Sequence, residues 1–208
     1  MRDGLRETAV SSEGATGADG SPAGMSDELL MVAFSRGSKD AFGELFSRYR
    51  QPVFGFFRRR VADAALAEEL TQETFLAMLG AATRYEPSAT FRTYLYAIAF
   101  NVLRAHRRRA ALRAMFSSTD AEEPAARNSM DADVVLRDAV GRLERVDREI
   151  LLLREFEELS YAEIAELLKL PLNTVRSRLF RARMALRELL GAPARGVATK
   201  FTEGEERV

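Results

Sequence analysis

The 208-residue chain contains no cysteine and a single histidine, His106. The absence of cysteine excludes disulfide bonds and thiolate metal sites, and it fits a reducing compartment. His106 lies among arginines, which disfavour a second cation beside them, so neither a zinc site nor a histidine base is expected. We therefore expect no metal and no cofactor.

Long apolar runs are also missing from the sequence. No run reaches the roughly 18 residues that a membrane span needs, and the N-terminus lacks the apolar segment of a signal peptide. We expect a soluble, cytoplasmic protein without membrane insertion. The G-x-x-x-x-G-K phosphate loop is absent, and acid pairs such as Glu68 and Glu69 are typical of solvated surface, so the sequence does not predict an enzyme or catalytic residues.

The formal charge is zero, with 31 basic and 31 acidic residues, but the charges are unevenly distributed. Residues 101–116 contain five arginines and no acid, and residues 171–187 contain five more and no acid. Between them, residues 117–133 carry five acids and one arginine. Two basic patches that flank an acidic connector indicate nucleic-acid binding despite the zero net charge.

The composition predicts an all-α fold of two small helical domains joined by a flexible linker. No strand-like alternation and no internal repeat is present. The expected parts are a disordered tail at 1–24, a helical domain at 25–113, a linker at 114–130, a helix-turn-helix domain at 131–190 and a loose tail at 191–208. The alternative for residues 1–24 is that they are not part of the functional protein, with translation starting at Met25.

Residues 159–187 form the most informative motif, which predicts a helix-turn-helix. Ser160 and Glu163 form an S-x-x-E capping box, which begins a short amphipathic helix that we expect to end near Lys169. Pro171 suits the first turn of a second helix, where its missing N–H costs nothing. The apolar stripe of that helix consists of Val175, Leu179, Ala182 and Leu186.

The second helix of this motif makes duplex DNA the first candidate partner. A recognition helix presents the side chains of its first turns to base edges in the major groove. The alternative is a basic, solvated helix in an all-α protein that does not bind DNA. The expected base-facing residues are Asn173, Thr174, Arg176, Ser177 and Arg178, and the expected phosphate contacts are Arg181, Arg183 and Arg187.

A helix predicted from Phe91 to Arg109 has one apolar and one basic face. An aromatic such as Phe100 among arginines would stack on unpaired bases, with Tyr94 and Tyr96 on the flanks as further platforms. The alternative is that Phe100 packs against the second domain or a neighbouring helix. The expected core face holds Phe91, Leu95, Ile98, Ala99 and Val102, and the opposite face holds Thr93, Phe100, Asn101, Arg104, Arg107 and Arg108.

Three segments in this order resemble bacterial RNA polymerase sigma factors of the extracytoplasmic-function (ECF) group. They are AEELTQETFLAML in the first block, FRTYLYAIAFNVLRAHRRR at its end and LSYAEIAELLKLPLNTVRSRLFRARMALR in the second block. The resemblance covers residues 27–190. It implies that the first block binds the polymerase clamp and melts the −10 promoter element, and that the second binds the −35 element.

The resemblance, together with the faces described above, assigns three sets of residues. The family usually has Trp at the position of Tyr94 and Arg at that of Phe100. The core-polymerase contact comprises Glu69, Gln72, Glu73, Phe75 and Leu76; the −10 contact comprises Tyr94, Phe100, Asn101, Arg104, Arg107 and Arg108; the −35 contact comprises Asn173, Thr174, Arg176, Ser177, Arg178 and Arg181.

The polymerase assignment has a physical alternative. Phe75 and Leu79 are expected to lie opposite Leu66 and Leu70, so this helix has two apolar sides and needs two partners. One partner would be the polymerase. In the alternative, both sides are buried inside the helical bundle.

We therefore expect a sigma factor that binds core RNA polymerase, directs it to specific promoters and helps to open the −10 element. Its expected partners are core RNA polymerase, promoter DNA and an anti-sigma factor. A stand-alone helix-turn-helix regulator and an adaptor that binds only protein are the alternatives. The sequence favours the sigma factor because a regulator needs no second basic, aromatic-bearing patch and an adaptor needs neither patch.

Overall fold

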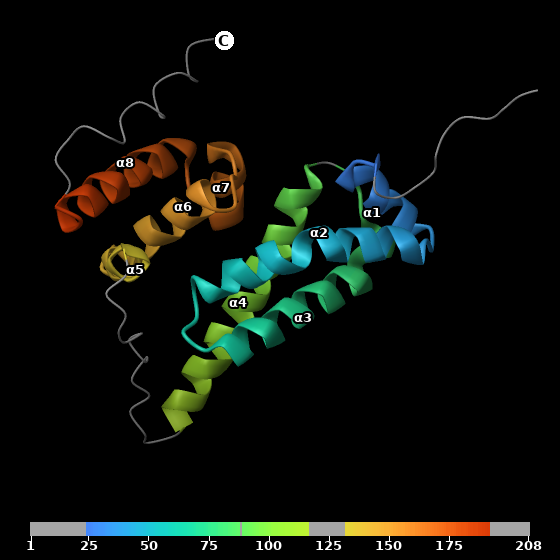
Figure 1. Cartoon of the computed structure of the whole chain (residues 1–208), viewed down its shortest axis with the longest axis horizontal. Coiled ribbons are helices and arrows are strands. Elements are labelled where there is room, and N and C mark those ends of the chain that lie inside the picture. Colours follow the sequence, from blue (N-terminus) through green and yellow to red (C-terminus); the bar gives the residue numbers. More distant parts are fainter. Residues whose placement is uncertain (1–23, 88, 117–131, 192–208) are drawn as a thin grey trace, which may run out of the picture.

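The computed structural model describes residues 24–87, 89–116 and 132–191. These residues form α-helices and a 3-10 turn and contain no strand, so the predicted all-α fold of two helical domains is confirmed. The helices of the two domains lie side by side (Figure 1). Nearly all of the two predicted tails and of the predicted linker lies outside the described residues. No described helix is long and apolar enough to cross a membrane.

The first domain consists of four α-helices and one 3-10 turn. The elements are α1 (Asp27–Ser35), α2 (Lys39–Arg58), α3 (Ala64–Ala81), η2 (Ala82–Arg84) and α4 (Phe91–Phe116). Helices α2 and α3 run side by side, and α4 packs against α3 (Figure 1). Helix α4 continues through Phe116, beyond the expected end of this block at residue 113.

Side-chain caps explain where the first helices begin. Ser26, Ser38 and Asp63 each accept a hydrogen bond from a backbone N–H in the first turn of α1, α2 and α3. Such a cap satisfies one of the free donors at the helix start and contributes about 1 kcal/mol. Between α1 and α2 the chain reverses at Gly37, whose φ of 102° favours glycine.

The second domain contains the predicted helix-turn-helix. Its elements are α5 (Ala132–Gly141), α6 (Arg145–Glu155), α7 (Tyr161–Leu168) and α8 (Leu172–Leu189). The predicted capping box is confirmed, because Ser160 and Glu163 each accept a hydrogen bond from the other's backbone N–H. Lys169, in the left-handed conformation with φ of 56°, ends α7, and Pro171 occupies the N-cap position of α8 without a side-chain cap.

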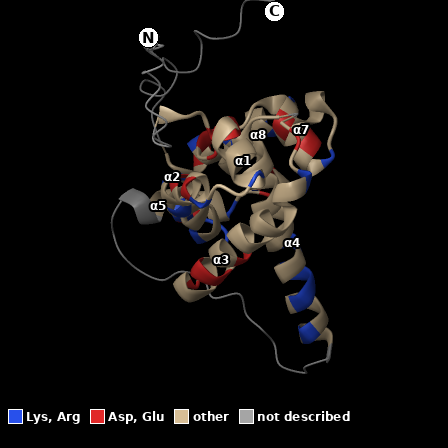
Figure 2. Ribbon diagram, turned by 90° about the vertical axis from the view of Figure 1, so that its right-hand side faces the viewer, with Lys and Arg blue, Asp and Glu red and all other residues tan. Residues whose placement is uncertain are grey.

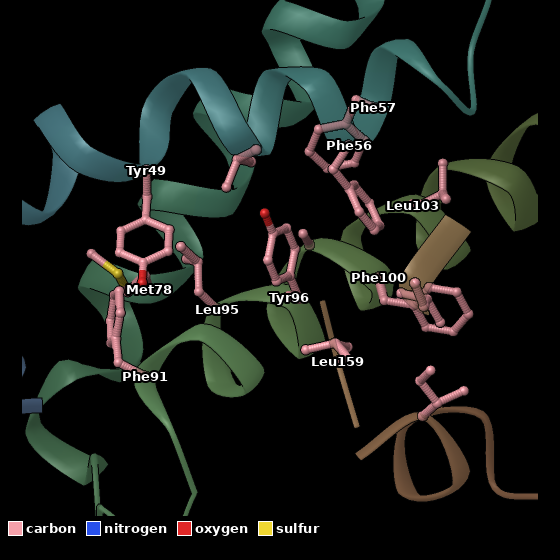
Figure 3. Close-up of a cluster of buried hydrophobic side chains, with 14 of the residues drawn as sticks. Tyr49, Phe56, Phe57, Met78, Phe91, Leu95, Tyr96, Phe100, Leu103 and Leu159 are labelled. Carbon is pink, nitrogen blue, oxygen red and sulfur yellow. The ribbon is translucent and has the colours of Figure 1, made fainter. Parts of the chain in front are cut away.

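Aromatic and aliphatic side chains form a core that continues from one domain into the other. Phe56 and Phe57 of α2 are fully buried, and Phe56 packs against Tyr96 of α4 with ring centroids 5.7 Å apart. Leu159, just before α7, belongs to the same buried cluster as these residues (Figure 3). Burying each large apolar side chain contributes about 1.5–3 kcal/mol, so apolar burial favours contact between the domains.

Candidate nucleic-acid and polymerase interfaces

Helix α8 buries one side and exposes the other, as the apolar stripe predicted. Val175, Leu179 and Ala182 are buried against α6 and α7. Four of the six residues assigned to the −35 contact lie exposed, and Thr174 is half-buried. The exposed residues are Asn173, Arg176, Ser177 and Arg181.

Arg183, an expected phosphate contact, pairs with Glu155 of α6 at 2.8 Å. The guanidinium of Arg178 also points toward α6. Its Nη1 donates hydrogen bonds to Glu144 Oε2 at 2.7 Å and to Asp147 Oδ1 at 2.8 Å. The hydrogen bond with Asp147 raises the pKa of Arg178. The charge of Arg178 is therefore engaged within the second domain in this structure, and its contact with DNA stays a prediction. Its role here is to hold the recognition helix against α6.

The structure adds Phe180 to the exposed side of α8. Its side chain is 65 % exposed, unusually open for a phenylalanine. It follows Arg176 by four residues and therefore lies on the same face of the helix. The sequence analysis missed Phe180, although its position outside the apolar stripe was the available signal.

The expected −10 face of α4 is only partly exposed. Asn101, Arg104 and Arg108 are exposed, and Figure 2 shows a basic stretch along the distal part of α4. Arg107 is half-buried, and burial lowers its pKa, an effect that nearby Glu149 opposes. The basic patch is therefore present, with one arginine turned toward the second domain.

Phe100 lies in the core, so the expectation of an exposed ring was wrong. Only 8 % of Phe100 is exposed, and it belongs to the same buried cluster as Leu103 and Leu159 (Figure 3). The predicted division into one core face and one exposed face failed because α4 is buried on two sides. One side packs into the first domain, while the other meets the second domain.

Tyr94 is half-buried beside the start of α4. Its ring packs edge-on against Tyr85, with centroids 4.9 Å apart, and is tilted against the ring of Phe91, with centroids 6.3 Å apart. Burial raises the pKa of Tyr94, and its hydroxyl is buried without a hydrogen-bond partner among the described residues. Tyr96, the other expected platform, is 4 % exposed, and burial raises its pKa to about 12.

The expected polymerase contact on α3 divides into surface and core residues. Glu69 and Gln72 are exposed, and Leu76 is 65 % exposed. Glu73 is half-buried and pairs with Arg109 of α4 at 3.3 Å. Phe75 is only 3 % exposed and packs edge-on against Phe46 at 4.8 Å, so the expectation of a free Phe75 was wrong. The apolar surface available on α3 is formed by Leu76 and Leu79.

A buried ion network that the sequence analysis missed joins the two domains. Glu157 Oε1 accepts hydrogen bonds from Arg59 Nη2 and Arg60 Nη1, each at 3.0 Å. Arg60 Nε also donates to Glu149 Oε1 at 2.6 Å. The side chains of Arg60 and Glu157 are 1 % and 0 % exposed. Sequence spacing offered no signal for these pairs, because they join residues about 90 positions apart.

A second group of polar contacts joins the start of α4 to the helix-turn-helix. Arg92 pairs with Glu158, and Thr93 donates a hydrogen bond to Glu163. Hydrogen bonds from Thr93 and Ser160 lower the pKa of Glu163 even though burial opposes them. The helix-turn-helix therefore contacts the first turn of α4, which also carries Tyr94 of the predicted −10 contact.

Two family models match the chain. The model for Sigma-70 region 2 matches residues 45–113, and that for Sigma-70 region 4 matches residues 133–186. RNA polymerase sigma factor CarQ of Myxococcus xanthus is 39% identical over 166 residues, which cover 77% of this chain and 95% of CarQ. The ECF RNA polymerase sigma factor SigC of Mycobacterium tuberculosis is 32% identical over 166 residues, covering 76% and 87%.

Solved structures show the same architecture. CnrH, in complex with the cytosolic domain of CnrY, is 27% identical with a TM-score of 0.61, covering 81% of this chain and 99% of CnrH. The sigma factor RpoE of Bartonella quintana, in complex with the anti-sigma factor NepR, has a TM-score of 0.62 at 23% identity. This match covers 74% of this chain and 98% of RpoE, and it supports the fold alone.

Proposed function

Because the chain belongs to the ECF group of bacterial RNA polymerase sigma factors, we propose which of its surfaces meet the polymerase and the promoter. As a sigma factor it is a transcription initiation factor that binds core RNA polymerase, directs the enzyme to promoters and helps to open the −10 element. A stand-alone helix-turn-helix regulator does not explain a matching region 2 that precedes region 4 in the same chain.

The exposed face of α8 is the proposed contact with the −35 element. The single observation that carries this assignment is the face shared by Asn173, Arg176, Ser177 and Phe180, which is open while the opposite stripe is buried. Arginine can pair with guanine edges, and an aromatic ring can pack against a thymine methyl group. Arg181, also exposed, is placed to meet a phosphate. Arg178 supports this face from behind.

The first domain supplies the two other proposed contacts. Asn101, Arg104 and Arg108 on α4 would meet the −10 strand, with Tyr94, Phe100 and Arg107 available only once their surroundings open. On α3, Leu76 would fill an apolar pocket of core polymerase, flanked by Glu69 and Gln72. Domain boundaries follow the same division, at 25–116 and 132–190.

We also propose an anti-sigma factor as a regulatory partner and the cytoplasm as the site of action. The support is the solved structure of CnrH, which is bound to the cytosolic domain of CnrY. Exposed apolar side chains such as Leu76 and Phe180 are surfaces that such a protein could cover in the absence of polymerase.

The test of the −35 assignment is reconstituted transcription. Core RNA polymerase, with or without the purified chain, transcribes a library of genome fragments, and RNA 5′ ends are sequenced. A defined set of start sites with a shared upstream sequence should appear only when the chain is present. Arg176→Ala should reduce initiation at these sites while core-polymerase binding is unchanged. Equal initiation by the parent chain and by Arg176→Ala would contradict the −35 assignment.

A further inference from the structure

A carboxylate on α1 caps the helix that carries the proposed −10 contact. Glu28 Oε1 accepts a hydrogen bond of 2.9 Å from the backbone N–H of Phe91, the first residue of α4. Backbone N–H groups in the first turn of a helix have no partner within that helix, and Phe91 is fully buried. Glu28 therefore satisfies a donor that burial would otherwise leave without a partner.

This cap differs from the caps of α1, α2 and α3, each of which comes from the residue just before the helix. Helix α4 has a local cap as well, because Thr90 Oγ1 accepts a hydrogen bond from the N–H of Thr93 at 3.3 Å. Glu28 adds a second cap from 63 positions earlier in the chain. The position of α4 against α1 is therefore fixed at the residue where α4 begins.

Asp27 holds α1 in the position from which Glu28 reaches α4. Its carboxylate accepts hydrogen bonds from Arg48 Nη1 at 2.7 Å and from the Tyr49 hydroxyl at 2.5 Å, both on α2. The ring of Tyr49 also packs edge-on against Phe91, with centroids 5.1 Å apart (Figure 3). All these groups belong to the first domain, so the cap does not depend on the position of the second domain.

The Glu28 carboxylate also lies close to the tyrosines beside the start of α4. Helix α1 packs against both η2 and α4, and so against both ends of the segment that joins them. Tyr85, at the start of this segment, packs against Tyr94. Burial raises the pKa of Tyr85, and the negative charge of Glu28 adds to this effect. Glu28 is therefore next to a residue of the predicted −10 contact.

We propose that Glu28 is a positioning residue for the −10 contact: its carboxylate fixes the first turn of α4, which carries Tyr94, so that the turn is already ordered when the separated strand reaches it. A contact that is ordered in advance costs less to form. Without the cap, part of the binding energy would be used to order the turn. This role rests on the proposed function, whereas the cap itself does not.

Glu28→Gln and Glu28→Met form the matched pair that tests this role. Both remove the charge, so both lose to the same extent any favourable interaction of Glu28 with the N-terminus of its own helix, α1. The glutamine amide oxygen can still accept the hydrogen bond from Phe91, whereas methionine, of similar length, offers only a weak thioether acceptor. A difference between the two variants therefore reports the cap on α4.

Amide hydrogen exchange in the free chain, followed by NMR, tests the cap without polymerase or DNA. The N–H of Phe91 should exchange slowly in the parent and in Glu28→Gln. In Glu28→Met it should exchange about fivefold faster, the factor to which the about 1 kcal/mol of a helix cap converts. Glu28→Ala makes the same test if Glu28→Met does not fold. Unchanged exchange at Phe91 in both variants that lack the acceptor would overturn the cap and the positioning role with it.

Promoter opening tests the positioning role itself. With closed complexes formed to completion, permanganate reactivity of the −10 thymines should develop about fivefold more slowly with Glu28→Met than with Glu28→Gln, by the same conversion. Closed-complex formation should be equal in the two variants. Ser38→Ala controls for stability, because it removes the cap at the start of α2 and leaves α4 untouched. This control should open promoters at the rate of the parent.

Each failure has a distinct meaning. Equal opening by Glu28→Met and Glu28→Gln would overturn the positioning role even if exchange confirms the cap. Equally slow opening by Ser38→Ala would overturn it too, because lower stability alone would then explain the defect. A parent chain that opens no promoter would overturn the proposed function and this role together, while exchange at Phe91 would still identify the cap.

Discussion

Arg178 Nη1 donates a hydrogen bond to Asp147 Oδ1 at 2.8 Å, which ties the recognition helix α8 to α6. Arg178→Ala should therefore lower the free energy of unfolding by about 1 kcal/mol, the upper range for a partly exposed ion pair. Urea denaturation followed by circular dichroism measures this change. DNA binding should weaken only to the extent that α8 moves away from its position on α6. Arg178→Lys should partly restore stability.

Arg176 provides the contrast, because its side chain is exposed on the opposite side of α8. Arg176→Ala should leave the unfolding free energy within about 0.5 kcal/mol of the parent, as for most surface changes. The affinity of this variant for the −35 element should fall. The expected loss of binding free energy is about 1–3 kcal/mol, the contribution of one base contact. Gel-shift titration with holoenzyme measures the loss. If Arg178→Ala showed this pattern instead, Arg178 would be a DNA contact.

The neighbours Phe75 and Leu76 should separate folding from polymerase binding. Phe75→Ala should destabilise the chain by about 3–5 kcal/mol, because a buried phenylalanine leaves a cavity. Leu76→Glu changes a side chain that is 65 % exposed, so stability should change little. Affinity for core polymerase should fall at least tenfold if Leu76 fills a pocket, since interface anchors contribute about 2 kcal/mol or more.

Thermal unfolding and surface-immobilised core polymerase provide the two measurements for this pair. The control is Leu112→Glu, another exposed leucine but on α4. Full polymerase affinity in Leu76→Glu would remove α3 from the proposed interface.

The pH dependence of stability should report Glu163. Hydrogen bonds hold the pKa of its carboxyl below the ordinary value of 4.5, against the effect of burial. A lowered folded-state pKa means that ionised Glu163 stabilises the fold above pH 4.5, and that this contribution is lost as the pH falls further. Glu163→Gln should cost about 1 kcal/mol at neutral pH, comparable to loss of a helix cap.

The difference between parent and Glu163→Gln should shrink once the pH drops below 4.5. Denaturation at a series of pH values measures it, and subtracting the variant removes the other carboxyl groups that titrate in the same range. Glu166→Gln, an exposed change on the same helix, should leave stability at neutral pH within about 0.5 kcal/mol of the parent. A constant difference at all pH values would mean that the charge of Glu163 is not what stabilises the fold.

The helix-turn-helix could be predicted from the sequence because each of its signals comes from residues close together in the chain. The Ser160–Glu163 box, the αL residue Lys169 and the stripe of Val175 and Leu179 depend on neighbours within a few turns. These features define the helices and the exposed face of α8 without knowledge of the rest of the chain.

Tertiary partners are what the sequence could not specify. The apolar periodicity predicted one core face for α4, but Phe100 on the opposite face is buried because a second domain packs there. Arg178 looks like any arginine of a recognition helix until Glu144 and Asp147 are brought beside it by folding. The Arg60–Glu157 pair lies outside every motif, so no pattern marked it.

The exposed and buried residues of α4 should behave differently when they are replaced. Phe100→Ala should lower thermal stability, with a cost of about 3–5 kcal/mol as for other buried phenylalanines. Asn101 and Arg104 are exposed, so the double change to alanine should leave thermal stability unaltered.

If these two residues hold the separated strand, the double variant should form closed promoter complexes normally and open them slowly, because unpairing costs a few kcal/mol that contacts to the strand must offset. Permanganate reactivity of thymines in the −10 element measures opening, and a pre-melted template should restore the double variant. Normal opening by the double variant on duplex promoters would show that the basic face of α4 does not hold the −10 strand.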